Sequence, residues 1–225
     1  VRSGNTLTLY VDGVSVASGD ISSLDGVNKA IQLGAYNSGT GQFYQGYIDD
    51  LRIIKGTALY TSNFNPPTSA LGVTGTKVTI QSDFKDQTKN QTIIKNGDVT
   101  LSPSVKKFGT SSAYFDGTGD YIEISNHGDF DLSDLDFTIE GWFYVAASGT
   151  VRLIHAGTVA DSIVPFLFYV SGTGFYFYSS GDGSNWNITG GSGVSLGSVT
   201  LNTWTHLAVS RRGNKIRCFQ DGVLK

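Results

Sequence analysis

Hydrophobic and polar residues alternate in short runs along almost the whole chain. The runs recur about every 8 to 12 residues and are separated by Gly, Asn, Asp or Ser, a pattern typical of a β-sandwich or barrel. Successive side chains of a strand point to opposite faces, so each run predicts a strand with one buried face. The expected strands cover residues 5–11, 30–36, 42–54, 77–82, 91–101, 111–115, 121–125, 137–145, 150–156, 165–171, 174–180, 185–189, 204–210 and 215–220.

The composition supports an all-β fold. Thr, Val, Ile, Tyr and Phe are plentiful, whereas Glu occurs only at Glu123 and Glu140. β-branched and aromatic residues favour strands, and Glu is one of the residues that build surface helices. The chain has 225 residues, of which 39% are hydrophobic, so it can bury a sizeable core as one large sandwich or as two small domains. Disorder is therefore not expected.

Charge and residue usage argue against several classes of function. The net charge is −3 and Lys and Arg are scattered singly, so no nucleic acid is expected as a partner. No apolar run approaches about 18 residues, so no membrane span is expected. Cys218 is the single cysteine and cannot form an internal disulfide. The chain has no methionine, which suggests a fragment of a longer protein.

The two ends of the chain are similar to each other. Residues 2–14 align without gaps with residues 211–223, at an offset of 209 positions, and six of the thirteen pairs are identical. Each copy consists of a Gly-Asn turn, a strand and an Asp-Gly turn. The match predicts a tandem array with a period near 209 residues, from which this chain contains parts of two repeats.

A proline-containing connector separates these two parts. Residues 65–76 combine Pro66 and Pro67 with small polar residues, and Pro cannot donate a hydrogen bond to a sheet. We interpret residues 1–71 as the closing third of one repeat and residues 72–225 as the opening two thirds of the next. Together they are expected to form one compact sandwich, within a chain or by strand exchange between chains, with one of the two duplicated strands displaced.

Six segments together resemble laminin G-like, concanavalin A-like lectin/glucanase domains. These segments are residues 107–122, 136–143, 202–209, 10–13, 31–34 and 43–53. The resemblance implies a jelly-roll sandwich of two antiparallel sheets, circularly permuted relative to the family because the closing segments come first. Residues 55–67 resemble the tandem copies found in phage tail-fibre and viral structural proteins.

Related jelly rolls include glycosidases, so a catalytic pair of carboxylates has to be considered. Retaining hydrolysis needs two carboxylates about 5 to 5.5 Å apart. On its predicted strand Glu140 shares a face with Thr138 and Trp142, and neither neighbour is acidic. Glu123 likewise has no acidic neighbour on its own face. The chain is therefore not expected to be an enzyme.

The resemblance also implies one structural calcium ion. In this superfamily an Asp of the closing strand and backbone carbonyls of an opening loop hold the ion, and calcium takes about six to eight oxygen ligands. The corresponding residues here are Asp49, Gly117, Gly119 and Asp120. The alternative is that Asp49 or Asp50 only caps a turn or pairs with Arg52.

The candidate sugar-binding residues are aromatic side chains with polar neighbours. Trp186 stands between Asn185 and Asn187, and an exposed aromatic ring offers a flat apolar face to a pyranose. Three tyrosines are expected on the same concave side, namely Tyr36, Tyr176 and Tyr178. The alternative is that Trp186 points into the sandwich and packs in the core.

The resemblance thus implies a non-catalytic carbohydrate-binding or structural attachment module of a phage or viral fibre or surface protein. The expected location is a virion or extracellular surface. The expected partners are a glycan and adjacent repeats or further copies of the chain. Two alternatives stay open, an accessory domain of a carbohydrate-active enzyme and a purely structural virion building block without a ligand.

Overall fold

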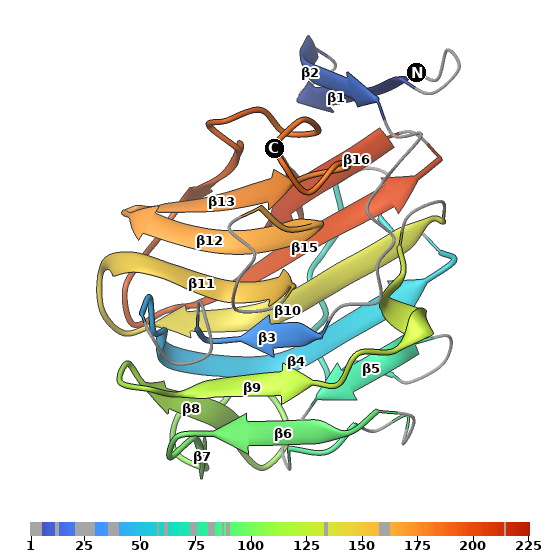
Figure 1. Ribbon diagram of the computed structural model, residues 1–225. Helices are drawn as coiled ribbons and strands as arrows, with labels where there is room; N and C mark the ends of the chain where they lie inside the picture. The colour runs from blue at the N-terminus through green and yellow to red at the C-terminus, as the bar shows by residue number, and fades with distance from the viewer. Residues whose placement is uncertain are drawn as a thin grey trace.

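The protein is a sandwich of two antiparallel sheets with a separate hairpin beside it (Figure 1). The computed structural model describes residues 6–11, 14–20, 30–35, 41–57, 59–60, 63–72, 76–80, 84–86, 88, 91–132, 135–157, 163–213 and 215–225. A single 3-10 turn, Gly128–Phe130, is the one helical element of this described part. No helix in the described part could cross a bilayer. The all-β expectation is therefore confirmed.

The strands are short, and most of them follow the alternating runs of the sequence. They are β1 (Thr6–Val11), β2 (Val14–Asp20), β3 (Ile31–Leu33), β4 (Gln45–Lys55), β5 (Thr76–Ile80), β6 (Ile93–Asn96), β7 (Thr100–Ser102), β8 (Ser112–Asp116), β9 (Tyr121–Ile124), β10 (Phe137–Val145), β11 (Gly149–Ala156), β12 (Phe166–Gly172), β13 (Gly174–Ser179), β14 (Val194–Ser198), β15 (Trp204–Arg212), β16 (Lys215–Gln220) and β17 (Val223–Leu224).

The two main sheets contain eight and seven strands. The eight-stranded sheet has the order β17-β16-β15-β10-β4-β8-β7, and β5 also pairs with β4. The seven-stranded sheet has the order β14-β13-β12-β11-β3-β9-β6. Strands from the N-terminal part of the chain thus lie in the middle of both sheets, because β4 pairs with β10 and β8, and β3 pairs with β11 and β9. The assignment of these strands to two different repeats stays a prediction.

The core fills the space between the two sheets. Alternate residues of β10, among them Ile139 and Phe143, face inward and are almost fully buried. Across the core the ring of Phe143 stacks near that of Phe168 on β12, with 6.3 Å between ring centroids. Cys218 belongs to the same core and is 1% exposed, as a small apolar residue would be.

Two of the expected strands differ from the structure. The run 91–101 is divided into β6 and β7 by a turn at Gly97, whose φ of 76° suits glycine. Residues 185–189 form bends and turns, and β14 follows them instead. Asn187 Oδ1 accepts a hydrogen bond from Gly181 N at 2.7 Å, and such local side-chain bonds compete with strand pairing.

A bulge in β4 changes which side chains reach the outer face of the eight-stranded sheet. Arg52 pairs with Glu140, whereas Asp49 pairs with Trp142, so two residues of β4 lie opposite one residue of β10. Asp50, in the bulge, has a φ of 51°. Its Oδ2 atom accepts a hydrogen bond of 3.0 Å from the backbone N of Leu71.

Residues 59–60 and 63–72, here called the crossing segment, lie on this outer face. Phe64 N donates to the carbonyl oxygen of Gly222 at 2.8 Å, and Leu59 N donates to Thr138 Oγ1 at 2.8 Å. The ring of Phe64 stacks on that of Tyr60, and both pack near Phe219 of β16. The predicted connector, residues 65–76, is attached to the sheet at Leu71, whose side chain is buried and whose backbone N donates to Asp50.

The two similar ends of the chain form two hairpins with the same register. In β1–β2, Val11 pairs with Val14, and in β16–β17, Gln220 pairs with Val223, which is the same pair shifted by the offset of the repeat. β16 takes the place beside β15 in the eight-stranded sheet. β1 pairs with β2 and lies near β16 (Figure 1). Among the described residues, β16 pairs with β15 and β1 does not.

Deleting residues 1–20 is expected to change the free energy of unfolding by less than about 1 kcal/mol, because the hairpin lies outside both main sheets. Deleting residues 215–225 removes the buried side chains of Ile216 and Phe219 and should cost on the order of 5 kcal/mol. Urea unfolding of both truncated proteins measures the difference. The assignment of the shared position to β16 is wrong if the first deletion is the more harmful one.

Candidate functional site

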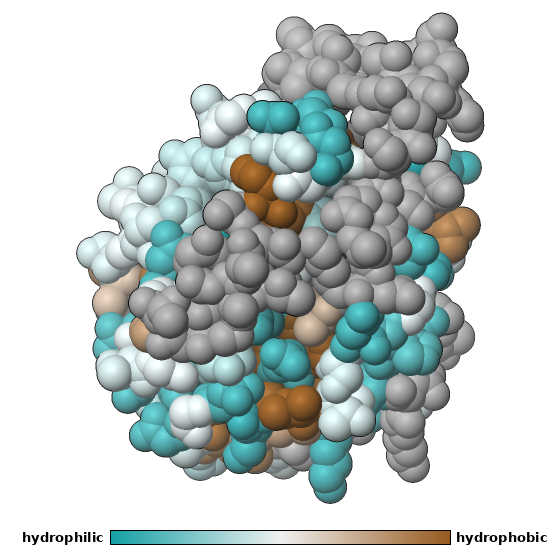
Figure 2. Space-filling view, viewed as in Figure 1, coloured by the Kyte–Doolittle hydropathy of each residue, from teal (hydrophilic) through white to brown (hydrophobic). Residues whose placement is uncertain are grey.

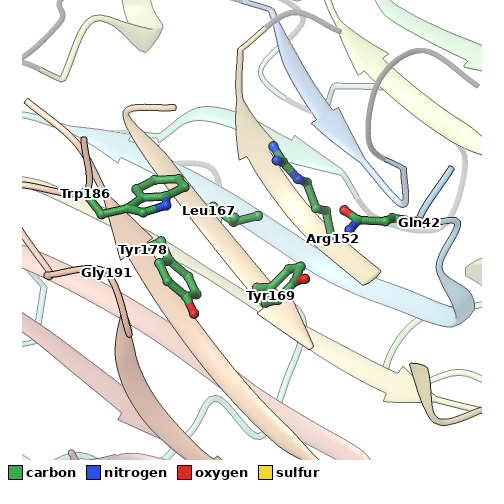
Figure 3. A pocket seen from close by; sticks show the side chains of 7 residues that line it. All are labelled: Gln42, Arg152, Leu167, Tyr169, Tyr178, Trp186 and Gly191. Carbon is green, nitrogen blue, oxygen red and sulfur yellow. The ribbon is translucent and has the colours of Figure 1, made fainter. Parts of the chain in front are cut away.

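A pocket of about 320 Å³ lies on the outer face of the seven-stranded sheet (Figure 3). In β12 the inward residues Phe166, Phe168 and Val170 belong to the core, so Leu167 and Tyr169 face outward. The residues lining the pocket are Gln42, Arg152, Leu167, Tyr169, Tyr178, Trp186 and Gly191. The coloured side chains on this side of the molecule are largely polar, with small hydrophobic areas between them (Figure 2).

The loop between β13 and β14 brings Trp186 over Tyr178. Their ring centroids are 5.1 Å apart at an interplanar angle of 53°. Asp182 Oδ1 shapes the loop by accepting hydrogen bonds from the backbone N atoms of Asn185 and Ser184, and these bonds lower the pKa of its carboxyl. A Cβ atom at Gly193, where φ is 67°, would lie 2.7 Å from the Tyr178 ring. Glycine is therefore required there for the ring to hold its position.

Aromatic edges and polar groups combine in this pocket. Tyr169 meets Tyr178 edge to face, with 5.9 Å between ring centroids. Burial raises the pKa of the Tyr178 hydroxyl, and the neighbouring Tyr169 and Tyr176 raise it further, so this hydroxyl remains a neutral donor and acceptor. Arg152 of β11 pairs with Tyr169, and Arg152 and Gln42 border the pocket on the side away from Trp186 (Figure 3). Gln42 Oε1 is buried without a hydrogen-bond partner among the described residues.

The structure brings together only some of the expected sugar-binding residues. Trp186 and Tyr178 line the pocket, and Trp186 lies outside the hydrophobic core, so the alternative of core packing is wrong. Tyr176 lies on the same face, with 6.5 Å between its ring centroid and that of Tyr178, but it does not line the pocket. Asn187 supports the loop through Gly181, and Asn185 is exposed on it. Tyr36 lies outside the described residues.

Sequence reasoning missed five of the seven residues that line the pocket, namely Gln42, Arg152, Leu167, Tyr169 and Gly191. The alternation in residues 166–170 contained the signal for Tyr169, because its inward neighbours are all large and apolar. Arg152 and Gln42 come from separate elements, and strand pairing and loop packing bring them to the pocket. No local pattern marks them.

A second polar cluster surrounds Glu140 on the outer face of the eight-stranded sheet. The Glu140 side chain is fully buried, and its Oε1 atom accepts hydrogen bonds from Arg52 Nε at 2.9 Å and from Arg52 Nη2. Its Oε2 atom accepts a hydrogen bond of 2.6 Å from the hydroxyl of Tyr60, in the crossing segment. His206 Nε2 lies 3.1 Å from the same oxygen. Both carboxylate oxygens are therefore engaged within the protein.

These contacts decide the ionisation of Glu140. Burial alone would raise its pKa, but the hydrogen bond to His206 and the charge of Arg52 outweigh burial, and the pKa lies below its ordinary value. A carboxyl whose folded pKa is depressed stabilises the protein above its unfolded pKa, and the effect is lost as the pH falls through the folded value.

Replacing Glu140 by Gln should lower the free energy of unfolding by about 3 kcal/mol at pH 7, since Arg52 then loses its buried partner. The Glu123→Gln variant is the matched control, and its half-buried side chain predicts a loss below about 1 kcal/mol. Urea unfolding between pH 7 and pH 3 should show the Glu140 effect narrowing below about pH 4.3. A constant difference across this range would contradict the assigned role of the charge.

The four residues expected to bind calcium lie in two separate places. Asp49 Oδ2 accepts hydrogen bonds from the backbone N atoms of Lys107 and Phe108, at 2.9 and 3.0 Å. The loop 117–120 follows β8 at the end where Asp116 pairs with Gln45, about 13 Å along β4 from Asp49. The structure thus does not bring Asp49 to the loop that contains Asp120.

The loop itself has a donor set that suits calcium. Carboxylate oxygens of Asp98, Asp116 and Asp120 lie within 4.8 Å of one another. A Cβ atom at Gly97 would collide with Asp120 Oδ1 and would lie 2.8 Å from the carbonyl oxygen of Gly119, so only glycine fits beside these two oxygens. Carboxylates and backbone carbonyls are the ligands that calcium prefers. Asp98, Asp116, Asp120 and Gly119 could therefore hold the ion, with no part for Asp49.

If this loop binds calcium, adding calcium to chelator-treated protein should raise the melting temperature, because an ion that binds only the native state stabilises it. The Asp120→Asn variant should lose the calcium response, and the Asp49→Asn variant should keep it. Differential scanning calorimetry with and without calcium measures both. If neither chelator nor calcium changes the melting temperature of the unaltered protein, the loop does not bind calcium.

The family of the chain follows from a comparison with known proteins. A family model described as the concanavalin A-like lectin/glucanases superfamily matches residues 1–60 and 116–225. The comparisons with curated proteins and with solved structures gave no match. The matched residues include the pocket strands β11, β12 and β13 and the central strand β4. The chain therefore belongs to the concanavalin A-like lectin/glucanases superfamily.

Proposed function

We propose that this domain is a non-catalytic carbohydrate-binding module that attaches a virion or extracellular surface protein to a glycan. The observation that carries the proposal is the pocket on the seven-stranded sheet, in which Trp186, Tyr178 and Tyr169 surround a space of about 320 Å³. A space of this size lies near the lower end of the range for small-molecule sites, about 300 to 1,000 Å³, and suits a short sugar unit.

The chemistry of the pocket supports a sugar as its ligand. A pyranose has apolar C–H faces and a rim of hydroxyls, and the aromatic rings offer flat surfaces for those faces. The Tyr169 and Tyr178 hydroxyls and the Gln42 amide offer hydrogen bonds to the rim. The unsatisfied Gln42 Oε1 in particular would gain a donor from a sugar hydroxyl.

Binding without catalysis is supported by the positions of the two glutamates. Among the described residues, no carboxylate lines the pocket, and retaining hydrolysis needs two carboxylates about 5 to 5.5 Å apart. Both oxygens of Glu140 are engaged on the other sheet. Glu123 lies on β9 and accepts a hydrogen bond from Gln32.

The cellular setting is proposed on the resemblance of residues 55–67 to tandem copies in phage and viral proteins. In an array, adjacent repeats would present several such pockets, and the repetition would raise the avidity for a surface glycan. A calcium ion in the loop 117–120 would stiffen the turn between β8 and β9 without entering the pocket.

Labelled protein on a glycan array should bind a defined set of sugars. The Trp186→Ala and Tyr169→Ala variants should each weaken binding to these sugars by about tenfold or more, because each removes one stacking surface. The Tyr121→Ala variant is the control, since Tyr121 is a half-buried tyrosine of β9, two strands away from the pocket strand β11 in the same sheet. Binding that survives both pocket variants, or no binding to any glycan, would overturn the proposal.

A further inference from the structure

Four aromatic side chains form a continuous row on the outer face of the eight-stranded sheet, opposite to the pocket. They come from neighbouring strands in one cross-strand register. Tyr144 of β10 pairs with Trp204 of β15 on one side and with Tyr47 of β4 on the other, and Tyr47 pairs with Tyr114 of β8. The three tyrosines face outward, because their sequence neighbours Phe143, Ile48 and Phe115 belong to the core. Trp204 also faces outward, because the core residue Leu207 lies three positions further along the regular strand β15.

The rings touch along the whole row. The ring centroids of Tyr144 and Trp204 are 5.5 Å apart, those of Tyr47 and Tyr144 are 5.2 Å apart, and those of Tyr47 and Tyr114 are 4.9 Å apart. Each of the four residues is only half-buried, so part of every ring remains accessible to solvent. The row therefore crosses four strands, which makes it longer than a single sugar ring.

The sheet beneath the row is held rigidly. The buried hydroxyl of Tyr44 donates towards the carbonyl oxygens of Tyr47 and Tyr144, at 3.0 and 2.8 Å, and so ties β4 to β10 below the aromatic rings. Gly46 permits this approach, since a Cβ atom there would collide with the Tyr144 carbonyl oxygen and the Tyr44 hydroxyl. A preformed surface loses little conformational entropy on binding.

The borders and the chemistry of the row indicate what can bind there. On one side Lys107 lies over the ring of Trp142, 3.9 Å from its centroid, and on the other side are the exposed polar residues Gln45 and Asn202. The row itself contains three phenol hydroxyls and one indole N–H, and no charged group. Burial raises the pKa of the Tyr47 hydroxyl, and the neighbouring Tyr114 and Tyr144 raise it further, so the Tyr47 hydroxyl stays neutral.

We propose that this aromatic row binds an extended, uncharged polysaccharide chain. The rings are tilted against one another by 33° to 84°, so the row presents both faces and edges of rings along its length. Such a chain presents apolar C–H groups that contact these faces and edges, and hydroxyls that bond to the phenol and indole tips. A wholly apolar partner would leave these four polar groups without hydrogen bonds, and a highly charged partner would find no opposite charge in the row.

This site goes beyond the proposed pocket and does not depend on it. The pocket is compact and lies on the seven-stranded sheet, whereas the row is long and lies on the eight-stranded sheet. With one site on each face, a single domain could bridge two glycan chains, and the two sites would act together in avidity.

Affinity gel electrophoresis of the full chain tests the row with four neutral polysaccharides as probes, namely hydroxyethylcellulose, arabinoxylan, galactomannan and dextran. At least one of them should retard the unaltered protein. The Tyr144→Ala variant, which removes a central ring, should raise the dissociation constant about tenfold. The Tyr114→Ala variant removes the last ring, which has a single aromatic neighbour in the row, and should give a smaller rise without disturbing the fold.

Two controls separate the row from the pocket. The Trp186→Ala and Tyr121→Ala variants alter residues on the side of the seven-stranded sheet, away from the row. Both should leave the retardation of the protein by the polysaccharide unchanged. If Trp186→Ala abolishes array binding while retardation by the polysaccharide persists, both sites are supported. If retardation is lost only in Trp186→Ala, the polysaccharide binds in the pocket and the row proposal is overturned.

Three further results would also overturn the proposal. These are the absence of retardation by all four probes, retardation that both row variants leave unchanged, and a self-association of the unaltered protein that Tyr144→Ala abolishes. The last result, measured by light scattering after gel filtration, would make the row an interface between copies of the chain. Circular dichroism and the melting temperature of each variant show whether it is folded.

Discussion

Strand β4 is the element on which the rest of the structure depends, because it is paired along both edges in the middle of the eight-stranded sheet. β10 lies on one edge, and β8 and β5 share the other. The chain reaches β4 from β3, which holds the matching central place between β11 and β9. Buried backbone N–H and C=O groups must be paired. Without β3 and β4, the strands on either side of them would lack hydrogen-bond partners in the middle of both sheets. The pocket and the aromatic row both rest on sheets that these two strands complete.

The bulge of β4 and the buried charge of Glu140 together fasten the crossing segment. The bulge sets the register in which Arg52 lies opposite Glu140, and Tyr60 brings the crossing segment to the same carboxylate. Removing a carboxylate from water is costly, and it is tolerated here because the charge of Arg52 and hydrogen bonds engage both oxygens. The outer face thus has a covered region around Glu140 and an open region along the aromatic row.

The two aromatic surfaces arise in different ways. The pocket needs a loop as well as a sheet, because Trp186 comes from the turn-rich segment before β14 and covers Tyr178. The row depends only on the register of strand pairing, because each of four neighbouring strands contributes one ring directly opposite the ring of the next strand. The sequence singled out Trp186 and Tyr178, since polar residues around a tryptophan are a local signal. The sequence did not reveal that Tyr169 and Arg152 lie side by side in the pocket, nor that four aromatic residues form a row. Both arrangements bring together residues that are far apart in the chain.

The sequence by itself determined the all-β class, most strand positions and the family, because alternation and turn residues are local properties of the chain. Residues 137–145 and 215–220 were predicted as strands with the bounds that the structure has. The tertiary structure decided which of the duplicated strands lies beside β15, and it placed Asp49 far from Asp120 although both were expected at one ion. Both outcomes depend on which strands pair and in which register. These features arise from backbone pairing between distant segments, and a shift of one residue in that pairing moves a side chain to the other face of the sheet.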